Sequence, residues 1–390
     1  MMRLTRPRRA GGFSIVEMMV AVTVGLLAIM FATRLIVGAE KNKTSSLGGS
    51  DQMQNGMLAL FSINGDAAQA GWGLNDELLV GCDTTLSDTD GYTLASATRG
   101  AATITPLAPV VITNSATGSD QLSLYSGSAS SGVGSVKVRS TYLGADALDI
   151  DTQAPFGFAS GDVVVVAPEP SGGGNCAVAQ LSADPLTSTL AFASGGAARF
   201  NSGTLGGNAY TAGRARVFNL GPARNLSLHT WSVQNGVLLL RASNLAGATT
   251  AGSAVVDNIV ALKAQYGFDT RADAIFSASA GMQVSQWSNT MIDADGLGGV
   301  GSAGDYRRVA AVRIAVVARS AAPEKPGSSG VCSATSTLPT AFAAASPAGV
   351  AAAPVTVSVA ITGDPVDWKC YRYRVFETIV PIRNAGWRPA

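Results

Sequence analysis

The chain has 390 residues, enough for one large or two modest domains. Its 27 basic and 26 acidic residues leave a net charge of +1, so bulk electrostatics give no argument for nucleic acid binding. Charged residues make up only 14% of the chain and glycines number 45, which is typical of a secreted β-rich domain with many turns and less so of a cytosolic enzyme.

A short basic segment at the N-terminus is followed by a long apolar run. The run covers residues 13–32, and Glu17 is its only charged residue. Since about 20 residues at about 1.5 Å each cross the hydrocarbon core of a bilayer, the run predicts a membrane-spanning helix. A carboxylate inside such a span is destabilising unless an opposite charge meets it, so Glu17 is a candidate functional residue.

The basic residues around this run predict its orientation. Fewer lysines and arginines follow the run than precede it, which places the leader in the cytoplasm and the bulk of the chain outside. The arginines of the leader are Arg3, Arg6, Arg8 and Arg9.

The start of the run resembles a known processing signal. Within residues 11–17, Gly12, Phe13 and Glu17 match the type III signal sequence of type IV pilins and of the pseudopilins of type II secretion. The resemblance implies that prepilin peptidase, a membrane aspartic peptidase, cuts between Gly12 and Phe13 and methylates the new amine of Phe13. It also implies that Glu17 pairs with the N-terminal amine of a neighbouring subunit during filament assembly.

Three other interpretations of the apolar run remain open. Val37-Gly38-Ala39 fits a secretory cleavage site, although the run exceeds the usual apolar core of about 7–15 residues and contains Glu17. A plain single-span anchor gives Glu17 no role. A buried core helix conflicts with the basic leader and with the length of the run.

The helix is predicted to continue beyond the membrane. Gly48-Gly49 is expected to interrupt it, and Ala70-Gly71-Trp72-Gly73 to end it, glycine being the usual C-terminal breaker. Between these points an apolar face recurs at helical spacing and predicts packing against a globular domain. That face consists of Met53, Met57, Leu60 and Phe61.

From about residue 80 onward, short β-prone runs alternate with glycine, serine, asparagine and proline. The clearest element is a hairpin, in which residues 226–233 and 237–241 flank the turn Asn235-Gly236. Residues 255–262 are predicted as a short helix. The remaining predicted strands cover residues 110–112, 121–125, 162–167, 217–220, 308–319 and 371–382.

Three further segments resemble the pilus-assembly protein W family of minor pilins, as does the turn at residues 70–73. Residues 259–267 resemble its helix-to-strand segment, residues 309–319 its central strand, and residues 373–384 its closing strand with an Arg-Asn ending. Two features depart from the family. Pro381 confines the closing strand to an edge or a bulge, and a Gly- and Ala-rich insert at about residues 324–354 is predicted as a surface loop.

Four widely spaced cysteines contain no C-x-x-C pair, which leaves a zinc or redox motif unsupported. In an oxidising periplasm disulfides persist, and four cysteines allow three pairings. We expect Cys82 with Cys176 and Cys332 with Cys370, because each pair lies in one half of the chain. Buried thiols that form no disulfide are the alternative.

Two motifs could carry catalysis or cofactor binding, and neither does so convincingly. His229, the sole histidine, lies in a predicted strand with no acid beside it in sequence, so a satisfied or solvated strand histidine is favoured over a catalytic one. Residues 299–304 match G-x-G-x-x-G, but a dinucleotide site needs a strand before the motif and a helix after it. An Asp-rich turn precedes this motif and a predicted strand follows it.

Two charged clusters are weaker site candidates. Asp293, Asp295 and Asp305 resemble part of a calcium loop, although the other ligands of an EF-hand are absent and an acidic turn is favoured. Six arginines could form a basic stripe for DNA, but edge strands carry such charges as ordinary protection against aggregation. These are Arg307, Arg308, Arg313, Arg319, Arg372 and Arg374.

Together these features predict an α+β pilin-like protein, with one long N-terminal helix packed on a β-rich periplasmic domain. The predicted parts are a leader at residues 1–12, a transmembrane half at 13–37, a periplasmic half at 38–73 and a β-rich domain at 74–390. The resemblance implies a structural role without cofactor, not an enzyme. It implies a minor pilin of the inner membrane that joins other minor pilins and the major pilin at a pilus tip, where such filaments serve adhesion and twitching.

Two alternatives to this function stay open. One is a pseudopilin of type II secretion, and the other is a membrane-anchored periplasmic module that binds DNA or another ligand.

Overall fold

The computed structural model describes residues 12, 14–128, 135–152, 156–195, 198–273, 275–277, 281–327 and 329–385, without the side chains of residues 40–47 and 385. These residues fall into two compact units, one ending at Asp51 and the other beginning at Gln52. Phe13 lies outside the described residues.

One helix, α1 (Ile15–Gln69), starts in the first unit and ends in the second. Its first part, Ile15–Ala39, is long and apolar enough to cross a membrane, and its side chains are exposed. The predicted interruption at Gly48-Gly49 is wrong, because α1 continues through both glycines. Glycine costs only about 1 kcal/mol relative to alanine in a helix, so two glycines can be tolerated within a long helix.

In the second unit, α1 buries a different face from the one predicted. Gly56, Ala59, Ile63 and Ala67 are buried, whereas Met53, Met57 and Phe61 are exposed and Leu60 is only partly buried. The helix ends at Gln69 as expected, with Gly71 in the left-handed conformation at a φ of 84°.

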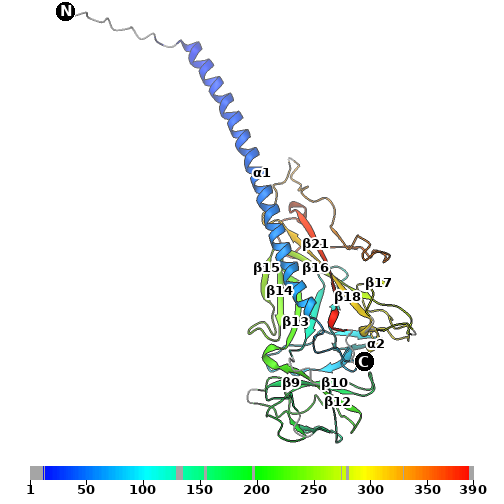
Figure 1. Cartoon of the computed structure of the whole chain (residues 1–390). Helices are drawn as coiled ribbons and strands as arrows, with labels where there is room; N and C mark the ends of the chain where they lie inside the picture. Colours follow the sequence, from blue (N-terminus) through cyan, green and yellow to red (C-terminus); the bar gives the residue numbers. More distant parts are fainter. Residues whose placement is uncertain are drawn as a thin grey trace, which may run out of the picture. The chain divides into compact units, whose positions relative to one another are not determined.

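Among the described residues of the second unit, the strands form three larger sheets and three two-stranded pairs, and Figure 1 labels several of these strands. The six-stranded sheet has the order β4 (Pro106–Leu107), β1 (Cys82–Thr85), β10 (Cys176–Gln180), β9 (Asp162–Pro168), β12 (Ala215–Pro222), β7 (Val136–Lys137). The five-stranded sheet has the order β15 (Ser253–Asp257), β14 (Val237–Ala242), β13 (Ser227–Gln234), β6 (Gln121–Ser126), β5 (Val110–Thr113). The four-stranded sheet has the order β17 (Gln286–Ser288), β16 (Ile259–Phe268), β18 (Val309–Arg319), β21 (Tyr373–Pro381).

Short elements complete the described residues. The two-stranded pairs are β2 (Ala97–Arg99) with β3 (Ala102–Ile104), β8 (Ala147–Asp149) with β11 (Thr189–Ala191), and β19 (Thr340–Ala341) with β20 (Val355–Thr356). The helical elements are α2 (Ala303–Arg307) and the single 3-10 turns η1 (Ala223–Asn225), η3 (Trp368–Cys370) and η4 (Arg383–Ala385).

The predicted hairpin is confirmed. Strands β13 and β14 pair from Gln234 and Val237 outward, and Asn235 and Gly236 have φ values of 51° and 80°. Positive φ at both central residues matches the type I′ turn that Asn-Gly favours. The predicted helix at residues 255–262 is wrong. This region ends β15, turns at Asn258 with a φ of 59°, and begins β16.

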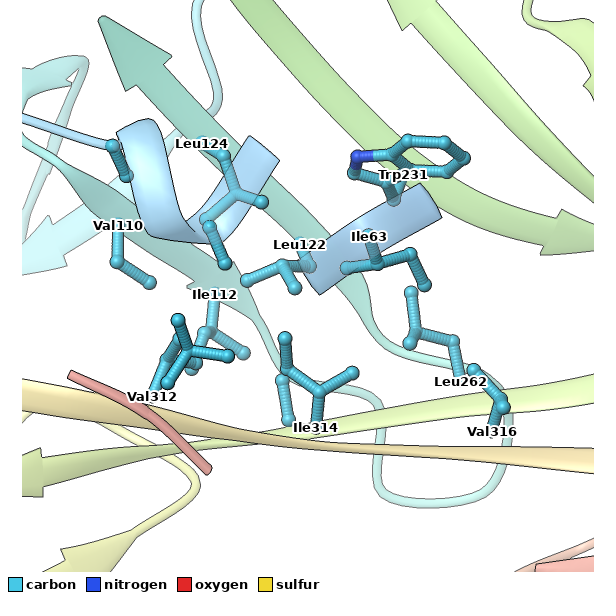
Figure 2. Close-up of a cluster of buried hydrophobic side chains, with 14 of the residues drawn as sticks. Ile63, Val110, Ile112, Leu122, Leu124, Trp231, Leu262, Val312, Ile314 and Val316 are labelled. Carbon is cyan, nitrogen blue, oxygen red and sulfur yellow. The ribbon is translucent and has the colours of Figure 1, made fainter. Parts of the chain in front are cut away.

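The main core lies where α1 meets the five-stranded and four-stranded sheets. Figure 2 shows Ile63 of α1 and Trp231 of β13 on one side of this cluster, with Ile314 and Val316 of β18 on the other. Strand β18 is buried along almost its whole length, because β16 and β21 pair with its two edges and side chains cover both faces. As Pro381 predicts, β21 is an edge strand.

The Gly- and Ala-rich insert is more than the predicted surface loop. Its strand β19 pairs with β20, and Phe342 packs with Val357 and Val359 against Val317 of β18. The insert therefore helps to cover the face of the four-stranded sheet opposite to α1. Its low sequence complexity hid this role, since alanine and glycine carry little periodic signal.

Candidate functional sites

The predicted processing and assembly residues lie at the start of α1. Gly12 is exposed, and Glu17 occupies the first helical turn, where the helix dipole favours an acid. Glu17 is exposed among the side chains of Val16, Val20 and Val24. Within the part of the chain that the structure describes, no basic side chain pairs with Glu17.

A second exposed feature lies on α1 in the second unit. The apolar stripe, defined as Met53, Met57 and Phe61, repeats every four residues, and its side chains are 39%, 58% and 76% exposed. Spacing of four residues places all three on one helical face. Because these large apolar side chains remain in contact with water, Met57 and Phe61 over more than half of their surface, the stripe is a candidate surface for another helix.

Both disulfides of the structure have the pairing expected from sequence. Cys82 of β1 is bonded to Cys176 of β10 with a Cα–Cα distance of 6.0 Å, and Cys332 is bonded to Cys370 with a Cα–Cα distance of 4.8 Å. Both distances lie in the ordinary range for disulfides. The first bond joins two neighbouring strands of the six-stranded sheet, and the second ties the insert to the residues before β21.

Asp293, Asp295 and Asp305 do come together, with carboxylate oxygens within 4.8 Å of one another. The buried carboxylate of Asp305 accepts hydrogen bonds from four backbone N–H groups, those of Ala294, Asp295, Gly301 and Ser302. It also completes a capping box with Ser302 at the start of α2. The acidic cluster therefore has a structural role, because Asp305 stabilises the turn that leads into α2.

The glycine motif at residues 299–304 lies in this same turn. The motif runs into α2, a helix of five residues that begins at Ala303, so the expected strand does not follow it directly. The long helix that a dinucleotide site requires is not formed at this place in the described residues.

His229 has an acidic partner that its sequence neighbours did not show. Asp66 of α1 accepts hydrogen bonds through Oδ2 from His229 Nδ1 and Trp231 Nε1, both at 2.8 Å. Burial lowers the pKa of His229, but the hydrogen bond and charge of Asp66 more than offset this, so the pKa is raised. The histidine is satisfied, as predicted, and the acid that satisfies it comes from α1, far from His229 in sequence.

The six arginines do not form a stripe. Arg308 and Arg313 are buried, and the latter is stacked 4.7 Å from the centroid of Trp287 and 4.5 Å from that of Phe342. Burial lowers the pKa of Arg313. Among the others, carboxylates pair with Arg307 (Glu77), Arg319 (Asp364) and Arg372 (Glu324), and Arg374 lies over Phe376. Distributed in this way, they offer no continuous cationic surface for DNA.

Comparisons with known proteins agree with the sequence resemblance. Residues 230–384, somewhat less than half of the chain, match the family model described as Type IV Pilus-assembly protein W. These residues include most of the hairpin β13–β14 and the whole four-stranded sheet. The resemblance noted from sequence is thus confirmed for the C-terminal part of the chain, and it is to a family of structural proteins and not of enzymes.

Among solved structures, the type IV-like pilin TTHA1219 from Thermus thermophilus is similar at 13% identity. The match covers 58% of this chain and 86% of that one, with a TM-score of 0.21. No curated protein matches the chain.

Proposed function

We propose that the protein is a minor pilin that takes part in assembling a type IV pilus. The proposal rests on the match of residues 230–384 to a pilus-assembly family. In the same chain, the first helix has an apolar segment of membrane length and carries Glu17 in its first turn. Prepilin peptidase is proposed to cut between Gly12 and Phe13, so that the mature chain starts with an N-methylated Phe13.

The exposed position of Glu17 supports a role in subunit contact. A carboxylate in lipid is strongly destabilised unless a cation reaches it. In this proposal the cation is the new N-terminal amine of a neighbouring pilin, held in the inner membrane before assembly. The apolar stripe extends the contact surface beyond the membrane, since Met53, Met57 and Phe61 lose water only when another subunit covers them.

Topology and place in the filament complete the proposal. The leader lies in the cytoplasm and the β-rich unit in the periplasm, followed by incorporation into the pilus. We place the protein at the tip with other minor pilins, because 390 residues is large for a subunit repeated along the shaft.

The test compares the wild-type chain with Glu17→Ala and Thr23→Ala in cells deleted for the native gene. Thr23 is a matched control, because its hydroxyl bonds only to the carbonyls of Met19 and Val20 in its own helix. N-terminal sequencing should show Phe13 first in all three proteins. Sheared pili should contain the wild-type and Thr23→Ala proteins, while Glu17→Ala should remain in the membrane.

Three outcomes would contradict the proposal. A chain that keeps Met1 or starts near Ala39 would remove the processing step. Normal incorporation of Glu17→Ala would remove the pairing of Glu17. Normal piliation and twitching after gene deletion, together with lost secretion of exoproteins, would instead assign the protein to type II secretion.

A further inference from the structure

A polar contact between side chains joins the end of α1 to the five-stranded sheet. Asp66 lies one turn before the end of the helix, and its Oδ2 accepts from both His229 Nδ1 and Trp231 Nε1 of β13. The side chain of Trp231 is buried in the main core, whereas Asp66 and His229 are partly accessible. Asp66 therefore accepts from two different donors. The indole of Trp231 always carries its proton, whereas the imidazole of His229 can exchange protons with solvent.

The hydrogen-bond partners of both ring nitrogens favour the positively charged form of His229. His229 Nε2 lies 2.8 Å from Oδ1 of Asn244, and the Nδ2 group of Asn244 donates to the hydroxyl of Ser227 at 3.3 Å. Both ring nitrogens thus face oxygen acceptors. A neutral imidazole carries one N–H and can satisfy only one of them, whereas the imidazolium donates to both.

Other charged groups do not compete for this histidine within the described part of the unit. On β14, the guanidinium of Arg241 lies 4.7 Å from the centroid of Tyr92 and donates to Thr93. On β6, the residue paired with His229 is Leu124. Among the described residues, Asp66 is the charged group that shifts the pKa of His229, and the net direction of the shift is upward.

We propose that Asp66 and His229 form a pH-sensitive latch that holds the end of α1 on β13. Since the folded pKa is raised above the unfolded value, the latch contributes its full stability below the unfolded pKa and loses it as pH rises through the folded pKa. Acidification therefore tightens the end of the helix, and alkaline conditions loosen it. This inference does not depend on the proposed role in pilus assembly.

The test uses the full chain in detergent micelles, labelled on histidine and tryptophan for NMR. His229 is the only histidine, so one titration curve reports the latch without assignment. We expect a midpoint above the ordinary value of 6.5, and the Nε1 proton of Trp231 should titrate with the same midpoint. Protection of the α1 amides near Asp66 against hydrogen exchange should fall above that midpoint.

Two variants separate the latch from a general effect of the fold. Asp66→Asn keeps an acceptor for Trp231 but removes the charge, so it should lower the midpoint of His229. Asp51→Asn changes an acid elsewhere on the same helix and should leave the midpoint unchanged. A midpoint at or below 6.5 in the wild-type chain, an unmoved midpoint in Asp66→Asn, or helix protection independent of the His229 titration would each overturn the proposal.

Discussion

Individual polar residues join parts of the second unit that are distant in sequence. Lys263 of β16 is 4% exposed and Asp120, just before β6, is 1% exposed, and their charged atoms are 2.8 Å apart. Asp120 also accepts from the backbone of Ser115 and Ala264. Because a buried charge without a partner is far less stable than a buried pair, each member fixes the position of the other.

Replacing Lys263 with methionine should therefore be strongly destabilising. We expect Lys263→Met to lower the free energy of unfolding by about 3–5 kcal/mol, because it leaves the carboxylate of Asp120 buried without its cation. Denaturant unfolding of the full chain in detergent measures the change. The double variant Lys263→Met with Asp120→Asn removes both charges and should recover part of the loss. A double variant no more stable than the single one would show that the charge is not the cause.

Among the elements, α1 is the clearest case in which the spacing of apolar residues does not tell which helical face is buried. Met53, Met57 and Phe61 have the size and spacing of a core face, yet the helix buries small residues on another face. At Gly56 an added Cβ would lie 2.1 Å from the ring of Phe376 on β21, so only glycine allows the observed approach. The large side chains at this contact come from the sheets. The periodicity of hydrophobic residues within the helix cannot reveal them.

A pair of glycine substitutions tests this packing. Gly56→Ala should destabilise the second unit by about 1–3 kcal/mol, because the ring of Phe376 must move. Gly65→Ala is the matched control on the same helix, since nothing lies within 4 Å of its added Cβ. It should stabilise by up to about 1 kcal/mol through helix propensity. Thermal unfolding of both variants measures this, and equal effects would contradict the packing described here.

At the scale of the whole molecule, strands far apart in sequence pair within each large sheet. β13 pairs with β6, and β1 pairs in parallel with β10. The disulfides also join distant parts of the chain, with sequence separations of 94 for Cys82 and Cys176 and of 38 for Cys332 and Cys370. A cross-link over a longer segment restricts the unfolded chain more, so the first bond should stabilise more than the second.

Replacing each pair of cysteines with serines tests this order. Each double variant should lose about 2–5 kcal/mol of unfolding free energy, with the Cys82/Cys176 variant about 0.8 kcal/mol worse on loop entropy alone. Mass analysis of the wild-type chain after alkylation without reduction should find no modified cysteine. Four alkylated cysteines would remove both disulfides from the protein as it is made in cells.

The sequence alone determined the features that depend on local chemistry. Segment length and hydrophobicity predicted the membrane-length part of α1, Gly71 its end, Asn235-Gly236 the hairpin, and Pro381 an edge strand. The roles of Gly12, Phe13 and Glu17 remain predictions from resemblance, because these residues are predicted to act on other proteins, the peptidase and a neighbouring pilin.

Only the tertiary structure decided which residues meet across the fold. In the structure, residues 255–262 form strands instead of the predicted helix, and α1 buries Gly56 instead of Met57. Asp66 contacts His229, and the six arginines that sequence had grouped lie apart. The physical reason is that burial and charge pairing are properties of neighbours in space. A helix or strand with two chemically acceptable faces takes the one that its partners can cover, and those partners lie too far along the chain for a local pattern to show.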